Sequence, residues 1–389
     1  MVLSVHAPSG RLPAGEEVFE SMKERYEEIC PDHHMSLEEI EEEARRQEAE
    51  MAAGPSRRDF LRTASIAALG AGALVAGSGK LSDILSSASV GAKHARLSRV
   101  VLVKHPKAVV NKTPSPDIVD RMVNHAVATL ADKKDPGEAW KELFSAKDVV
   151  GIKINGIAGK GLSSNVDVVN AIVAALTKAG VEGNNIIIWG STEGRIEKAG
   201  FKPNTSSTGV RIFNAPEAGY SEPYELKEFG IKTRLTKIIT EQITALINVP
   251  VLKDHALAGI TYSLKNISHG STNNPGDLHR NNCDPAIAEV NAIPLIREKQ
   301  RLIIGDALLA CYDKGPWHNP RYKWVENTIM AAHDPVAIDT VGLQIIEAKR
   351  KVEGIAPIGK RAKHLSTAAR LGIGVDDPDR IEMIKEQLT

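Results

Sequence analysis

Basic side chains gather directly after an apolar segment in the middle of the chain. Residues 252–255 read Leu-Lys-Asp-His, and Lys265, Asn266 and His269 follow within the next fourteen positions. A lysine in a partly desolvated pocket loses its proton more readily than a solvated one, and histidine titrates near neutral pH. Such a group can position an anion, transfer a proton or bind a metal ion.

These residue types suggest separate roles within one site. We predict His255 as the proton carrier, and Lys253 and Lys265 as groups that polarise an anion or a carbonyl. Asn266 and His269 are candidate cofactor contacts. The alternative is that the lysines are exposed to solvent and the histidines are structural.

A second polar segment follows an earlier apolar run. Lys153-Ile154-Asn155-Gly156 is followed by Gly159-Lys160-Gly161. Glycines let the backbone approach an anion, and lysines supply positive charge. The segment is not a Walker loop, because it lacks the first glycine and the final hydroxyl of that motif. Lys153 and Asn155 are therefore candidate cofactor contacts, and a glycine-rich surface loop is the alternative.

Two aspartates follow later apolar runs. Asp306 comes directly after residues 302–305, where it could accept a proton or bind a metal ion, and we predict it as a catalytic residue. Asp334 precedes Pro335, a pattern typical of a helix N-cap, and we predict a cap there. Further loop candidates for the site are His279, Arg280, Cys283 and His318.

The spacing of apolar residues predicts the elements that position these side chains. The predicted strands are residues 100–103, 149–154, 186–189, 246–252 and 302–305. A helix is predicted from an N-cap at Ser164 to Gly180, and another over residues 336–350. Continuous apolar strands that alternate with helices predict a three-layer α/β fold, with a mostly parallel sheet and helices on both faces.

This fold class also predicts where the polar groups meet. In open α/β sheets, ligands bind beyond the carboxyl ends of the strands. Lys153, His255 and Asp306 each lie at or just after the end of a predicted strand. We therefore expect these three side chains in a single cleft at one edge of the sheet.

The N-terminal part contains an export motif. Residues 56–62 read Ser-Arg-Arg-Asp-Phe-Leu-Arg, which resembles the twin-arginine signal through Arg57, Arg58, Phe60 and Leu61. A weakly apolar stretch interrupted by glycines follows, so we expect no stable transmembrane span. The motif predicts the twin-arginine translocase as a partner and a periplasmic or otherwise exported protein, tethered if the signal stays uncleaved. An ordinary buried Ala/Gly-rich helix is the alternative.

Composition divides the chain into three parts. Residues 1–55 carry 14 acidic and 5 basic side chains, which predicts a disordered extension or a solvated helix. Residues 56–92 are the predicted signal segment, and residues 93–389 the α/β domain. That domain is mildly basic, which suits a small anionic ligand. It has no Lys/Arg run, so we do not expect nucleic acid binding.

Cysteine content limits the cofactors. Three cysteines without a C-x-x-C pair argue against an iron–sulfur cluster, which normally needs four thiolates. Cys283 and Cys311 are predicted to be buried thiols, and a disulfide between them is the alternative. A metal ion fits the His and Asp candidates, but the sequence does not identify the metal or its ligands.

Several ordered motifs together carry a family resemblance. They are Lys153-x-Asn155, Ser163-Ser164-Asn165, Lys253-x-His255, Thr261 with Lys265-Asn266, Asp306 with Gly315-Pro316, and Asp334-Pro335-Val336-Ala337-x-Asp339. From about Val149 to Ile346 the chain resembles the uncharacterised proteins called domain of unknown function 362. Some members of that family carry a ferredoxin-like segment with four-cysteine motifs, which this chain lacks. The resemblance implies where a site lies, but not its chemistry.

Two functions fit these features. The first is an exported enzyme that depends on a cofactor or a metal ion and acts on a small anionic substrate. One form of this hypothesis is a redox enzyme. The second is a non-catalytic periplasmic binding protein whose lysines hold a small anion. A purely structural role fits less well, because polar groups clustered at strand ends are a costly way to build a scaffold.

Overall fold

The computed structural model of the protein describes residues 97–191 and 195–389. The acidic segment 1–55 and the signal segment 56–92, with Arg57, Arg58, Phe60 and Leu61, lie outside the described residues. Among the residues described, no helix combines the length and the apolar character that crossing a membrane requires.

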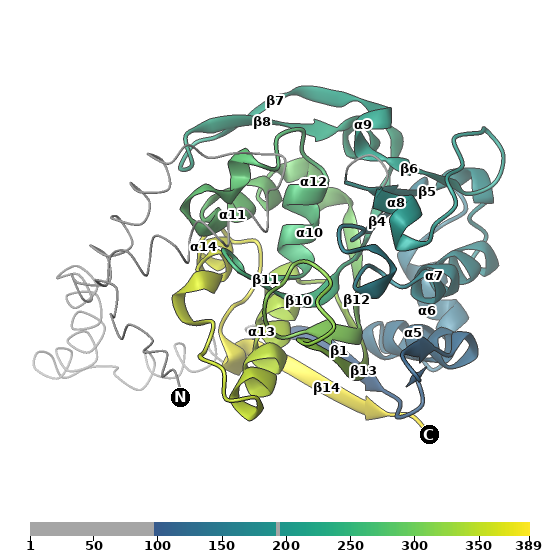
Figure 1. The fold of residues 1–389 in the computed structure, drawn as a ribbon. Coiled ribbons are helices and arrows are strands. Elements are labelled where there is room, and N and C mark those ends of the chain that lie inside the picture. Colours follow the sequence, from purple (N-terminus) through teal and green to yellow (C-terminus); the bar gives the residue numbers. More distant parts are fainter. Residues whose placement is uncertain (1–96, 192–194) are drawn as a thin grey trace, which may run out of the picture. The chain divides into compact units, whose positions relative to one another are not determined.

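A ten-stranded sheet organises the described part of the chain (Figure 1). Eight strands lie in the order β14-β1-β13-β12-β9-β4-β5-β6, while β10 pairs with β12 and β11 pairs with β10. The strands are β1 (Ser98–Lys104), β4 (Val150–Ile154), β5 (Ile186–Gly190), β6 (Arg211–Asn214), β9 (Ala245–Val249), β10 (Val251–His255), β11 (Gly259–Thr261), β12 (Gln300–Cys311), β13 (Lys323–Ala332) and β14 (Ile381–Gln387).

Most neighbouring strands are parallel, as predicted. The run β12-β9-β4-β5-β6 is parallel throughout, and β10 also runs parallel to β12. Antiparallel pairing enters through β13, which lies between β1 and β12, and through the short β10–β11 hairpin. Pairing of β1 with β14 is parallel again.

Helices cover both faces of the sheet, which confirms the three-layer prediction. Along β5, Ile186 and Ile188 belong to one apolar cluster while Ile187 and Trp189 belong to another, as expected for side chains that alternate between faces. The first face is covered by α5 (Pro116–Leu130), α6 (Pro136–Leu143) and α7 (Val166–Lys178). On the second face lie α10 (Ser263–Gly270), α11 (Ala286–Asn291) and α12 (Pro294–Lys299), and Figure 1 shows the two groups apart.

Shorter elements complete the described region. Its other helices are α8 (Arg195–Ala199), α9 (Ala215–Ala218), α13 (Pro335–Val352) and α14 (His364–Arg370). Two small antiparallel pairs are β2 (Val109–Val110) with β3 (Thr113–Pro114), and β7 (Tyr220–Leu226) with β8 (Ile231–Thr236). Short helical segments are η1 (Gly159–Gly161), η2 (Gly183–Asn185), η3 (Ile238–Gln242), η4 (Asp277–Cys283), η5 (Gly359–Ala362) and η6 (Pro378–Arg380), and η4 is kinked at Arg280–Asn282.

Each predicted strand is present, but two differ in extent. The run 246–252 forms two strands, β9 and β10, that break at Pro250 because proline has no N–H to donate. Both strands pair with the same edge of β12, one after the other. The run 302–305 is the core of a longer strand, β12, which continues to Cys311.

The helix ends were predicted with mixed success. The N-cap of α7 is Asn165, whose side chain accepts from the Asp167 N–H, and not Ser164 as expected. The Ser164 hydroxyl is already engaged, since it accepts from the Asn155 N–H and donates to the Val249 carbonyl. The predicted cap at Asp334 is confirmed, because its carboxylate accepts the first free N–H groups of α13.

Candidate functional site

The predicted site residues come from three strand ends and one helix. β4 supplies Lys153, β10 supplies Lys253 and His255, β12 supplies Asp306, and α10 supplies Lys265, Asn266 and His269. Asn155 follows β4 directly. All of these side chains except that of His269 are at most 7% exposed, so they lie inside the protein.

Helix α10 is anchored at its first residues by a buried carboxylate. Asp339 of α13 accepts from the backbone N–H groups of Ser263 and Leu264 at 2.6 and 3.0 Å. Burial raises the pKa of Asp339 to about 8, although these two hydrogen bonds oppose the shift. Asn248 of β9 holds the same end by donating to the Ser263 carbonyl and hydroxyl. The anchoring fixes Lys265 and Asn266 against the strand ends.

Lys153 is buried among uncharged partners. Its ammonium donates to the carbonyl oxygen of Ile154 and lies 3.5 Å from the Asn266 amide oxygen. Burial lowers its pKa to about 7, because no nearby charge compensates for the lost hydration. Space for the ammonium depends on Gly270, where a Cβ atom would lie 2.4 Å from the Lys153 Nζ.

Lys253 has the same character on the neighbouring strand. Its ammonium donates to the Asn155 amide oxygen at 2.9 Å and to the Leu162 carbonyl at 3.2 Å. Burial, with a smaller contribution from the charge of Lys265, lowers the pKa of Lys253 to about 7. Each of the two strand lysines is therefore paired with an asparagine, Asn266 or Asn155, that the sequence had assigned to the site.

The hydrogen bonds of His255 determine its protonation. Its Nδ1 accepts from the backbone N–H groups of Leu257 and Ala258 at 3.2 and 3.0 Å, so the ring proton resides on Nε2. Nε2 is buried and has no hydrogen-bond partner in the described part of the chain. Burial and the charge of Lys265 lower the pKa of His255 well below its ordinary value, which keeps the ring neutral.

A group of imidazole rings lies next to Lys265. Its ammonium is 3.1 Å from Nε2 of His279, and the His279 ring stacks on that of His255 with centroids 5.5 Å apart. The ring of His269 meets His279 edge-on at 4.5 Å. His364 of α14 is fully buried, and burial together with Lys265 lowers its pKa to about 3.

Asp306 holds the loop between β4 and α7. Its carboxylate accepts from the Asn165 N–H at 2.8 Å and from the Leu308 N–H at 3.1 Å. Burial raises its pKa to about 6, and the two backbone hydrogen bonds oppose that rise. Because the loop it holds also carries Asn155 and Leu162, the partners of Lys253, Asp306 orients this part of the site.

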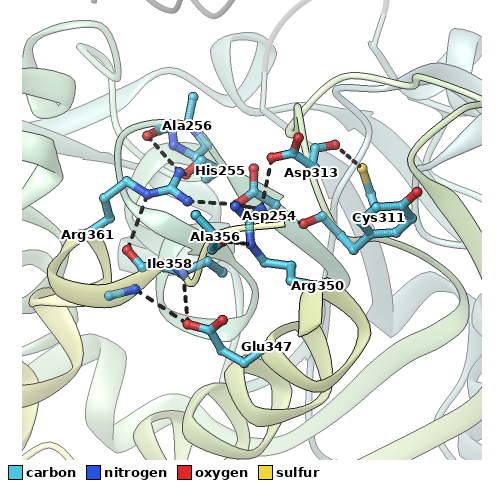
Figure 2. A network of polar contacts seen from close by, with 12 residues as sticks. Asp254, His255, Ala256, Cys311, Asp313, Glu347, Arg350, Ala356, Ile358 and Arg361 are labelled. Atoms are coloured by element: carbon cyan, nitrogen blue, oxygen red, sulfur yellow. Dashed lines mark hydrogen bonds and ion pairs between the residues drawn. The ribbon is translucent and has the colours of Figure 1, made fainter. Parts of the chain in front are cut away.

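Asp254 belongs to a polar network that the sequence did not suggest (Figure 2). Strand alternation places its side chain opposite those of Lys253 and His255. There its carboxylate lies 3.6 Å from Arg350 and 3.7 Å from Arg361. Burial nevertheless raises the pKa of Asp254 to about 7, and the two guanidinium groups oppose the rise. Arg361 also donates to the carbonyls of His255 and Ala256, which fixes the turn after β10.

The other loop candidates occupy different positions in the structure. His279 and Cys283 lie beside the predicted residue His269, with ligand atoms of all three within 4.8 Å of one another. The guanidinium of Arg280 lies over the Phe229 ring. Cys283 and Cys311 are both buried and no disulfide joins them, as predicted. The H-x-x-x-C spacing of His279 and Cys283 was a signal available in the sequence, whereas nothing in the sequence marked His364 or Arg361.

The chain belongs to the family described as "Domain of unknown function (DUF362)", whose pattern matches residues 150–344. The matched region begins with β4 and ends within α13, so it contains every predicted catalytic and cofactor-binding residue. Arg361 and His364 lie beyond it. None of the curated proteins matches this chain.

Two solved structures are similar to parts of the chain. One is a protein from Thermotoga maritima, at 12% identity and a TM-score of 0.37, covering 66% of this chain and 59% of that one. The other is the lactate racemase apoprotein from Thermoanaerobacterium thermosaccharolyticum, at 12% identity and a TM-score of 0.34, covering 65% and 58%. This chain therefore spans less than two thirds of the length of either.

Proposed function

We propose that this protein is an enzyme that acts on a small anionic substrate bound among the basic residues at the ends of β4 and β10. The observation that carries this proposal is the burial of Lys153 and Lys253 with uncharged hydrogen-bond partners and pKa values of about 7. Burying an ammonium group without a counter-charge costs free energy. Lysines of this kind therefore occur mainly where a ligand or a reaction requires them.

The shifted lysines are suited to proton transfer. A group with a pKa near the working pH is present in both protonation states, which is the condition for efficient general acid–base catalysis. An anion bound nearby would favour the charged form of Lys153 and Lys253, and so would be held by them. Asp306 would act as an orienting residue, because its oxygens already accept from backbone N–H groups.

His255 fits a role as a hydrogen-bond donor better than the proton-carrier role suggested by the sequence. A neutral ring with its proton on Nε2 can donate to a substrate oxygen, and its lowered pKa opposes uptake of a second proton. A neutral donor of this kind stabilises negative charge as it develops on the substrate. Dependence on a metal ion or another cofactor is part of the proposal.

The test is a search for small molecules that remain with the purified protein. Mass spectrometry of denatured wild-type protein should detect a stoichiometric small anion. Lys253→Met should lose it, and Lys178→Met, at an exposed lysine of α7, should retain it. Equal retention by all three proteins would remove Lys253 from the proposal. Conversion of the recovered anion on prolonged incubation with enzyme supports catalysis, whereas tight binding without conversion indicates a binding protein.

Export by the twin-arginine route is a separate proposal, supported by the motif at residues 56–62. We expect the full chain to fractionate with the periplasm. Replacing Arg57 and Arg58 by lysine should leave it in the cytoplasm, and a periplasmic double variant would contradict export by this route.

A further inference from the structure

Two histidines and a cysteine come together beside the basic site, on segments that are separate in the chain. His269 lies near the C-terminus of α10, while His279 and Cys283 belong to η4. One ligand atom from each side chain lies within 4.8 Å of the other two. Ligand atoms of a tetrahedral zinc site are roughly 3.5 Å apart, given Zn–S and Zn–N bonds of about 2.3 and 2.1 Å. A contraction of roughly 1 Å would bring these three atoms to bonding positions.

Buried ring nitrogens without partners point to a missing ligand. Nε2 of His269 is buried and has no hydrogen-bond partner among the residues described, while its Nδ1 lies 2.9 Å from the Ser268 hydroxyl. That second contact fixes the ring orientation, as hydrogen bonds to ligating histidines commonly do. The unpartnered Nε2 of His255 is close by, on the ring that stacks on His279. Buried polar atoms are rarely left unsatisfied without a functional reason.

We propose that His269, His279 and Cys283 bind a divalent transition-metal ion such as Zn²⁺ and leave one coordination position open. Two imidazoles and a thiolate suit Zn²⁺ and its neighbours, whereas Mg²⁺ and Ca²⁺ prefer oxygen ligands. Three protein ligands with an open fourth position are the usual arrangement of a catalytic zinc site. The proposal locates the cofactor dependence proposed above, but metal binding can be tested without any substrate.

The surrounding charge sets conditions on this site. The Lys265 ammonium lies 3.1 Å from Nε2 of His279, so it would repel a metal dication bound by this histidine. Two negative charges reduce the repulsion: the Cys283 thiolate, which forms when a metal binds, and an anion at the open position. An anion so placed would also contact Lys265, so the metal and the lysines would hold one ligand between them.

The backbone of η4 brings Cys283 to this position at a conformational cost. Asn281, Asn282 and Cys283 are consecutive non-glycine residues with φ values of 55, 54 and 65°. Such left-handed residues each cost of order 1 kcal/mol or more and cluster at functional sites. His269 and His279 are partly exposed, whereas Cys283 is buried.

Cobalt provides a direct test, because a thiolate bound to Co²⁺ gives an intense near-ultraviolet charge-transfer band. The chain has three cysteines, so a Cys30→Ser/Cys311→Ser variant keeps only Cys283. Titration of this metal-free variant with Co²⁺ should produce the band at one equivalent. A further Cys283→Ser change should abolish it, and His269→Gln should weaken Co²⁺ binding at least tenfold.

The outcomes separate this proposal from the proposed function. If the variant is folded, as verified by circular dichroism, and gives no band, the metal-site proposal is overturned. The proposal is also overturned if His269→Gln and His279→Gln bind Co²⁺ with the same affinity as their parent variant. If removal of Cys311 prevents folding, wild type and Cys283→Ser are compared instead, and the band must be absent only from the latter. Loss of the metal site with retention of a small anion by wild type but not by Lys253→Met would leave the proposed function standing.

Discussion

Gly270 determines where the Lys153 ammonium can lie. Any side chain at this position would occupy the space of the lysine, since a Cβ atom would be 2.4 Å from both its Cε and Nζ. Position 270 is the last residue of α10, so alanine suits the helix itself, and the expected effect comes from displacement of Lys153.

We therefore predict that Gly270→Ala lowers the free energy of unfolding by about 1–3 kcal/mol, as overpacking of a buried position does. It should also abolish retention of the small anion. Gly183→Ala is the matched control, because its nearest neighbours would be 3.5 Å from the new Cβ. Urea unfolding of both variants measures the difference, and equal stability would show that Lys153 has room to move.

Lys253 should make stability depend on pH above neutrality. Its pKa is about 7 in the folded protein and 10.5 for the free side chain. Between these values the unfolded chain binds a proton that the folded protein does not, so the free energy of unfolding rises with pH. For one group the slope is at most about 1.4 kcal/mol per pH unit. Below pH 7 both states bind the proton, and the slope disappears.

Lys253→Met removes this contribution while keeping a side chain of similar length. Urea unfolding between pH 7 and about 10 should give a shallower rise for the variant than for wild type, and Lys178→Met should follow wild type. Parallel curves for wild type and Lys253→Met would mean that Lys253 is charged in the folded protein at these pH values.

For individual residues, the sequence identified the side chains of the site but not how deeply they are buried. Lys153, Lys253, Lys265 and His255 were predicted from their places after apolar runs. The charge of Lys265 acts on both Lys253 and His255, and Lys153 lies beside Asn266, the neighbour of Lys265. Burial could not be inferred, because whether a lysine at a strand end is exposed depends on the loops that fold over it. In this protein, the loop carrying Asn155 and Leu162 does so.

Helix α13 and strand β10 are joined through one buried arginine. Arg350 is 4% exposed and donates to Asp313 and to the carbonyls of Tyr312 and Ala356, besides its ion pair with Asp254 (Figure 2). Glu347, one turn earlier on the helix, accepts from the Ile358 N–H and so fixes the segment that carries Arg361. The helix therefore supports β10 from the face opposite Lys253 and His255.

Arg350→Met should destabilise the protein by about 3–5 kcal/mol, because it leaves Asp254 buried with only one guanidinium nearby. The double variant Asp254→Asn/Arg350→Met should lose less than the sum of the single variants. Arg370→Met is the control, since the Arg370–Glu228 pair is exposed and should contribute little. Additive losses measured by thermal unfolding would indicate that Arg350 acts only through its hydrogen bonds.

Among the elements, periodicity predicted strand positions and failed at their ends. The break at Pro250 was visible in the sequence, but the apolar run continues across it, and only pairing with β12 shows two strands. Ser164 and Asn165 are both good N-cap residues. The choice between them was made by the Asn155 N–H and by the Val249 carbonyl, which is 85 residues away in the sequence, because both engage the serine.

Over the whole described region, α7 and the parallel core of the sheet followed from the alternation of strands and helices, whereas the antiparallel edge did not. β13 and β14 have irregular or alternating burial patterns typical of partly exposed strands, and these give weak signals in sequence. Their pairing with β1 joins the beginning and the end of the described region. Such long-range pairing is not encoded in any local pattern.

A chain that ends at residue 376 tests the importance of this edge. It lacks β14 and exposes the backbone of β1 from Ser98 to Lys104. We expect the midpoint of thermal unfolding to fall by roughly 5 °C or more, and self-association to increase, because unpaired edge strands are templates for further pairing. Size-exclusion chromatography and thermal scans against the full chain measure both. An unchanged midpoint with a monomeric profile would contradict the prediction.

The pairing of β1 also sets the order in which the protein can be assembled on the ribosome. The first strand of the described region, β1, has β13 and β14 as its sheet neighbours. It must therefore remain without a partner while residues 105–322 are translated, although the other parallel strands can associate as they emerge. We expect β1 to be an exposed, aggregation-prone apolar segment of the nascent chain throughout this interval. Chaperones that bind such segments should therefore bind this chain until β13 has been translated.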